Sequence, residues 1–127
     1  GNARGNEKMT IKELITAVSE EVKIKSARTF WDKDVLGIQP EEYLVWKVTG
    51  YNDRIDSDNE NEIQERIVRV SLFSKNDDFD ERAERIIEAV RRKGYKAYLL
   101  SFEDYEKETK YHHKEFEIIW RKNNEQS

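Results

Sequence analysis

Apolar residues recur at helical spacing in two stretches of the chain. The first stretch begins at Thr10, and Glu13 stands three residues later, the spacing of a capping box. The second begins at Asp78, repeats that spacing to Glu81, and stops at Gly94, which favours the left-handed conformation that ends a helix. The expected buried residues are Ile11, Leu14, Ile15, Val18 and Val22 in the first helix, and Phe79, Ala83, Ile86, Ile87 and Val90 in the second.

Alternation of apolar and polar residues predicts strands between and after these helices. We expect main strands over residues 43–49, 65–73, 95–102 and 111–121, and a short extended segment over 23–30. Loops are expected over 31–40 and 103–110. Residues 50–64 show no regular apolar pattern, so they form either a long loop or two strand extensions joined at a tip.

These elements predict an α+β fold. Strands joined by turns favour antiparallel pairing, and two amphipathic helices can cover one face of the resulting sheet. We therefore expect an antiparallel or mixed β-sheet of about four to five strands with two helices packed on one face. A single domain is expected over residues 9–122, followed by a polar tail over 123–127. Residues 1–8 precede the only methionine, Met9, and are expected to be an addition to the natural chain.

Composition narrows the functional classes. Charged residues make up 39% of the 127 residues and hydrophobic residues 36%, a balance that approaches that of disordered chains. Fourteen aromatic residues and the apolar periodicity indicate instead a folded domain with a heavily charged surface. Cysteine is absent, which excludes disulfides, thiolate zinc sites and cysteine nucleophiles. The net charge of −4 gives no chain-wide basic footprint for nucleic acid. No apolar run approaches the roughly 20 residues that a membrane-spanning helix needs.

The segment 51–65 is strongly acidic. Its one basic residue is Arg54, and its carboxylates are Asp53, Asp56, Asp58, Glu60, Glu62 and Glu65. The spacing of three of them resembles the start of a calcium loop, but Asn61 and Ile67 stand where such a loop needs Gly and Glu. The segment is therefore either a solvated loop or a negative surface that repels something negative, such as DNA passing nearby.

No motif predicts a catalytic or cofactor site. His112 and His113 are adjacent, and on a strand adjacent side chains point to opposite faces, so they cannot readily share a metal or a proton. The chain has no Gly-rich phosphate loop, nucleophile elbow or paired-histidine zinc motif. We expect no enzyme activity, no metal and no cofactor. Phe30 and Trp31 lie in a predicted loop and are the expected exposed apolar patch, a feature that often marks a contact.

Several local strings resemble the tail terminator proteins, also called tail completion proteins, of long-tailed non-contractile phages and prophages. They include Tyr43-Leu-Val-Trp-Lys-Val-Thr49 followed by an acidic segment, and a closing segment from Glu108 to Ile119. The strand Ile67-Val-Arg-Val-Ser-Leu-Phe-Ser-Lys75 leads straight into an acidic helix start and is the strongest likeness. The resemblance covers about residues 10–121.

This resemblance implies a structural protein of the virion tail that assembles in the bacterial cytoplasm. Such proteins form a ring, usually a hexamer, that caps the tail tube and offers a surface for head–tail joining. The implied partners are further copies of the chain, the tail tube protein and the head-completion protein, with DNA passing nearby without specific binding and no membrane. The expected interface or lumen residues are Phe30, Trp31, Asp53, Asp56, Asp58, Glu60 and Glu62. The alternatives are another head-completion or neck protein, and an acidic inhibitor or immunity-type protein that binds a basic partner.

Overall fold

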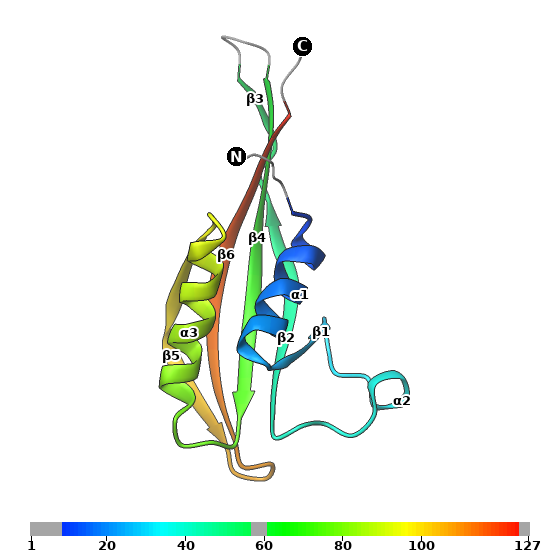
Figure 1. Cartoon of the computed structure of the whole chain (residues 1–127), viewed down its shortest axis with the longest axis vertical. Coiled ribbons are helices and arrows are strands. Elements are labelled where there is room, and N and C mark those ends of the chain that lie inside the picture. The colour runs from blue at the N-terminus through cyan, green and yellow to red at the C-terminus, as the bar shows by residue number, and fades with distance from the viewer. Residues whose placement is uncertain (1–8, 57–60, 125–127) are drawn as a thin grey trace.

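A computed structural model describes residues 9–56 and 61–124. Within those residues the chain forms three helices and six strands (Figure 1). In chain order they are α1 (Ile11–Val22), β1 (Lys25–Arg28), α2 (Lys33–Leu36), β2 (Glu42–Tyr51), β3 (Arg54–Asp56), β4 (Asn61–Ser74), α3 (Phe79–Arg92), β5 (Lys96–Glu106) and β6 (Tyr111–Asn124). In the same described residues no helix is long and apolar enough to cross a membrane.

All the strands belong to one mixed sheet. The order across it is β1-β2-β4-β6-β5, and β3 pairs with β4 off this path. The short β1 runs parallel to β2, and every other pair is antiparallel. Helices α1 and α3 lie side by side on one face of the sheet, while α2 stands apart beyond β1 (Figure 1). The predicted α+β class with two helices on one face is confirmed. β1 lies within the extended segment predicted over 23–30, and the additional strand is the short β3.

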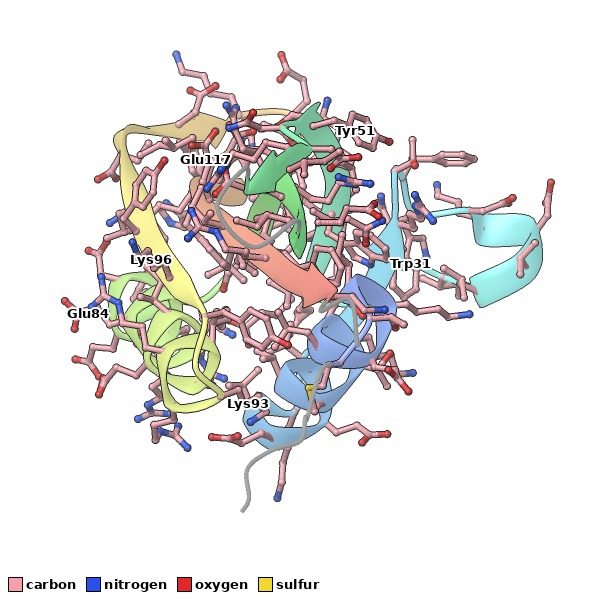
Figure 2. The ribbon with its side chains drawn as sticks, turned by 90° about the horizontal axis from the view of Figure 1, so that it is seen from above. Trp31, Tyr51, Glu84, Lys93, Lys96 and Glu117 are labelled. Carbon is pink, nitrogen blue, oxygen red and sulfur yellow. The ribbon has the colours of Figure 1, made fainter. Side chains whose placement is uncertain are left out.

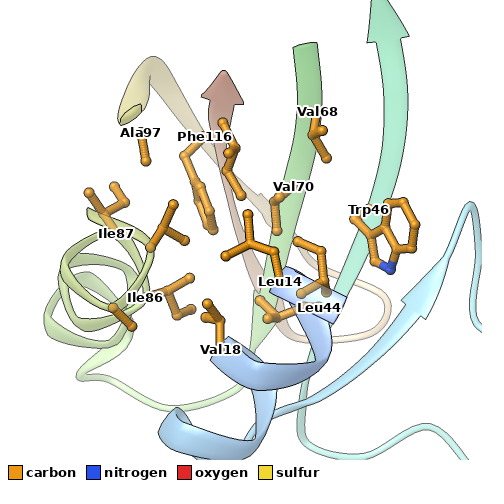
Figure 3. Close-up of a cluster of buried hydrophobic side chains, with 14 of the residues drawn as sticks. Leu14, Val18, Leu44, Trp46, Val68, Val70, Ile86, Ile87, Ala97 and Phe116 are labelled. Carbon is orange, nitrogen blue, oxygen red and sulfur yellow. The ribbon is translucent and has the colours of Figure 1, made fainter. Parts of the chain in front are cut away.

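The main core lies between the two long helices and the sheet. Leu14 and Val18 of α1 and Ile86 and Ile87 of α3 point toward the central strands, and Phe116 of β6 lies between them (Figure 3). The strands contribute residues that alternate along each strand and are almost entirely shielded from solvent. These residues are Leu44 and Trp46 of β2, Val68, Val70 and Leu72 of β4, and Phe116, Ile118 and Trp120 of β6.

The helix ends follow the sequence in two cases and depart from it in one. Thr10 and Glu13 form the predicted capping box, with Glu13 N–H donating to Thr10 Oγ1 at 3.1 Å and Thr10 N–H donating to Glu13 Oε1 at 2.8 Å. Gly94 has φ of 93° and follows the last turn of α3, as predicted. The second predicted capping box is wrong, since the Asp78 carboxylate caps no backbone N–H and instead accepts from Arg82 Nε at 3.3 Å.

The sheet extends beyond the helices as an arm made of β3 and the ends of β2, β4 and β6 (Figure 1). Of the two alternatives for residues 50–64, the described part is therefore strand extension; the tip, residues 57–60, lies outside the described residues. The predicted loop over 103–110 is wrong in its first half, because β5 continues to Glu106. The charged residues there pair across to β6, with Glu103 opposite Lys114 and Asp104 opposite His113.

Candidate functional site

The face of the sheet away from α1 and α3, here called the open face, carries a cluster of aromatic rings. Tyr43, Phe73 and His113 lie opposite one another on β2, β4 and β6, and their rings stack in a row with centroids 4.9 Å and 4.4 Å apart. Trp31 leans on Tyr43 at 5.5 Å, and Tyr111 meets Tyr43 edge-on at 5.4 Å. Burial among these rings raises the pKa of Tyr43 to about 12. The cluster forms a second, smaller core.

This second core holds the β1–β2 loop, residues 29–41, in one conformation. The Trp31 side chain is buried, and its Nε1 donates to Gly37 O at 2.9 Å, which ties the start of the loop to the end of α2. Gln39 Nε2 donates to the Tyr43 hydroxyl at 3.2 Å, and the Tyr111 hydroxyl donates to Pro40 O. The loop, which includes the single helical turn α2, is thus anchored at several points.

The anchored loop presents four apolar side chains to solvent. Phe30 is 61% exposed, Val35 77%, Leu36 45% and Ile38 92%. We call these four residues the apolar loop patch. Large apolar groups held outward by a fixed backbone are typical of surfaces that bind another protein.

The sequence prediction for Phe30 and Trp31 is half correct. Phe30 is exposed, as expected. The expectation that Trp31 is also exposed is wrong, because only 8% of its surface reaches solvent and its ring packs in the second core. Trp31 therefore positions the patch instead of belonging to it. Val35, Leu36 and Ile38 were missed, although their succession in a loop between two strands is itself the signal that could have found them.

A pocket of about 340 Å³ lies between the loop and the open face. Phe30, Trp31 and Tyr43 line its apolar side, and Lys47 and Arg69 contribute to its polar side. The pocket is open to solvent, and Phe30, one of its lining residues, is largely exposed.

Arg69 joins two carboxylates beside the pocket. Arg69 donates to Glu115 Oε1 at 3.0 Å and to Glu117 Oε2 at 3.0 Å, and the Tyr98 hydroxyl donates to Glu117 Oε1 at 2.7 Å. The Tyr98 hydrogen bond, with Arg69 beside it, holds the pKa of the Glu117 carboxyl below its usual range. Glu117 lies on the side of the sheet away from the helices (Figure 2). This network joins β4, β5 and β6, and its cross-strand pairing could not be read from the sequence.

The two histidines lie on opposite faces, as predicted. His112 stacks on Phe79 of α3, with centroids 4.4 Å apart, whereas His113 stacks on Phe73 on the open face. His113 Nε2 lies 3.2 Å from Glu115 Oε2. In the described residues no group of three histidine or carboxylate side chains is close enough to hold a metal ion.

The acidic arm is less negative than its sequence window indicates. Asp53 pairs with Arg66, and Glu65 pairs with Arg121, whose Nη2 lies 2.6 Å from Glu65 Oε2. Hydrogen bonds from Arg66 and Arg121, respectively, hold the pKa values of these two carboxyls below their usual range. Arg54 also lies within 4.0 Å of Glu65. Arginines distant in sequence thus neutralise part of the negative charge of the arm. That charge is what would attract a basic partner.

The remaining predicted acidic residues are placed only in part. Asp56 ends β3, opposite Asn61, and Glu62 lies half-buried on β4, opposite Ile55. Asp58 and Glu60 lie outside the described residues. The structure therefore places the arm but does not bring these carboxylates together with Phe30 and Trp31, which lie at the β1 side of the sheet (Figure 1).

Comparison with known proteins adds no family. No protein-family profile matches this sequence, and no curated protein matches it significantly.

Backbone strain at the start of the β1–β2 loop gives the first prediction. Thr29 has φ of 73°, a conformation that is unfavourable for a β-branched residue, and asparagine tolerates it better. We expect Thr29→Asn to raise the free energy of unfolding by about 1 kcal/mol, measured by urea denaturation. Thr29→Val keeps the branched side chain and should give no gain. A loss of stability in Thr29→Asn would contradict the assignment of strain.

Proposed function

We propose that this chain is a structural assembly protein of a phage or prophage, which caps the tail tube as a ring and provides the head–tail joining surface. The observation that carries the proposal is the apolar loop patch, held outward by the buried Trp31. The aromatic side chains of the second core anchor a loop that exposes apolar groups. Such an arrangement is typical of proteins that bind other proteins. The likeness of several strands to tail terminators adds support for this kind of assembly.

A ring of subunits can end the growth of a tail tube. Tube subunits stack without limit when each offers the same two faces, and a ring with one different face ends the stack. Each contact can be weak, because several copies bind one tube together. In such a ring the acidic arm is our candidate for the wall near the DNA, where its carboxylates would keep the DNA from adhering. An assembled ring with the arm on its outer rim would contradict that placement.

The apolar loop patch provides the test. The double variant carries Phe30→Ser and Ile38→Ser. Because both side chains are exposed, we expect each substitution to change the free energy of unfolding by no more than about 0.5 kcal/mol. The same variant should lose binding to tail tubes, seen as uncapped tube ends in negative-stain micrographs. The tubes should come from the tail tube protein encoded near this gene.

The matched control is Ile55→Ser on the arm. Ile55 is 71% exposed and apolar but lies away from the loop, so its replacement should leave tube capping unchanged. Full capping by the Phe30 and Ile38 double variant would contradict the proposal. Genes for a tail tube and a tape-measure protein beside this one are also expected.

A further inference from the structure

The two outer strands of the sheet carry opposite charges. On β1, Lys25 and Arg28 are exposed at one edge of the sheet. On the second half of β5, Glu103 and Asp104 are exposed at the other edge. Among the residues that the structure describes, none of these four side chains forms an ion pair within the chain. The two strands lie on opposite sides of the sheet (Figure 1).

Each edge carries its charge on both faces of the sheet. Lys25 is registered with Tyr43 on the open face, whereas the Arg28 guanidinium lies 4.9 Å from the centre of the Trp46 ring on the helix face. On β5, Asp104 is opposite His113 of the open face. Its neighbour Glu103 is therefore on the helix face, because side chains alternate along a strand. The basic and acidic edges thus match face by face.

Both edges also expose apolar surface. The apolar loop patch directly follows β1. On β5, Tyr98 is 44% exposed, Leu99 39% and Tyr105 47%. Outer strands with such side chains are sites where a further chain can add to a sheet.

We propose that the β1 edge of one copy, with its apolar loop patch, binds the β5 edge of the next copy. The occupant is a second copy because the chain itself carries both complementary edges. Contacts between two β1 edges or two β5 edges would oppose like charges, so charge selects the head-to-tail contact. A head-to-tail contact with a suitable rotation closes into a ring. This inference rests on the proposed function and names the surfaces that join its subunits.

Charge exchange between the edges tests the contact. One variant carries Lys25→Glu and Arg28→Glu, so both of its edges are acidic. The other carries Glu103→Lys and Asp104→Lys, so both of its edges are basic. Each variant alone should self-associate more than about tenfold more weakly than the wild type in sedimentation velocity at low salt, because like charges now meet. Thermal melts should show both variants folded, since all four side chains are exposed.

The equal mixture of the two variants is the decisive sample. Each acidic edge then finds a basic edge on the other variant, so association should return, with copies alternating and an even number per ring. Added salt should weaken association of the wild type and of the mixture alike. Undiminished association of either single variant, a folded mixture that does not associate, or a wild type that stays monomeric at its highest soluble concentration would overturn the edge-to-edge contact.

Capping of tail tubes is measured separately from self-association. If the mixture forms rings but neither it nor the wild type caps tail tubes, the edge contact stands and the proposed tail function fails. If the wild type caps tubes while the charge exchange has no effect on association, the tail function stands and the subunits join through other surfaces.

Discussion

Replacement of Phe116 by alanine is expected to lower the free energy of unfolding by about 3–5 kcal/mol. Phe116 is 0% exposed and lies on β6, between β4 and β5 in the sheet. Its ring packs under both long helices, so the cavity left by alanine would be lined by α1, α3 and the sheet together (Figure 3). A rigid surrounding of this kind cannot collapse to fill the space, which favours the upper part of the range.

Urea denaturation followed by circular dichroism measures this loss. Phe30→Ala removes the same atoms from a side chain that is 61% exposed, and it should change the free energy of unfolding by less than about 0.5 kcal/mol. Domains of this size are stable by about 5–15 kcal/mol, so the loss expected for Phe116→Ala is a large fraction of the total stability. Equal effects of the two substitutions would show that the core is assigned to the wrong face of the sheet.

The core could be predicted from the sequence because its pattern is local. Val68, Val70 and Leu72 alternate with polar neighbours, and the alternation alone fixes which side faces the helices. The capping box at Thr10 is local in the same way, since donor and acceptor lie three residues apart. At Asp78 the same spacing failed because Arg82, one turn along α3, takes the carboxylate instead.

The candidate site was only partly predictable because its contacts join distant residues. The network of Arg69 with Glu115 and Glu117 connects positions 46 and 48 residues apart, and their pairing depends on the register of β4 and β6. The partial neutralisation of Glu65 by Arg121 has the same origin. The opposite charges of the two sheet edges also became visible only once β1 and β5 were known to be the outer strands.

Trp31 shows how one side chain can reverse its predicted role. A tryptophan in a loop next to an exposed phenylalanine predicts an exposed apolar pair. The tertiary fold instead turns Trp31 onto Tyr43, and the hydrogen bond from its Nε1 to Gly37 O closes the loop around it. Burial of Trp31 is what leaves Phe30 and Ile38 outside, so the sequence located the correct loop and assigned the wrong side chain to its surface.

Replacement of Trp31 by alanine is accordingly expected to remove both stability and assembly. The loss of the buried indole should lower the free energy of unfolding by about 3 kcal/mol, the lower part of the usual range because the second core is small and partly open. Without the indole the β1–β2 loop loses its anchor to Gly37. The apolar loop patch then keeps its residues but loses its fixed arrangement, so tail-tube capping should fail at temperatures where the domain is still folded.

Trp31→Phe separates packing from the hydrogen bond. It retains most of the ring contact with Tyr43 but removes the donor to Gly37 O, and it should cost about 1 kcal/mol with tube capping retained. Limited proteolysis within residues 33–38 gives a direct readout of the loop, with cleavage faster in Trp31→Ala than in Trp31→Phe. Normal capping by a folded Trp31→Ala chain would show that the patch needs no fixed arrangement and that a held apolar surface does not account for assembly.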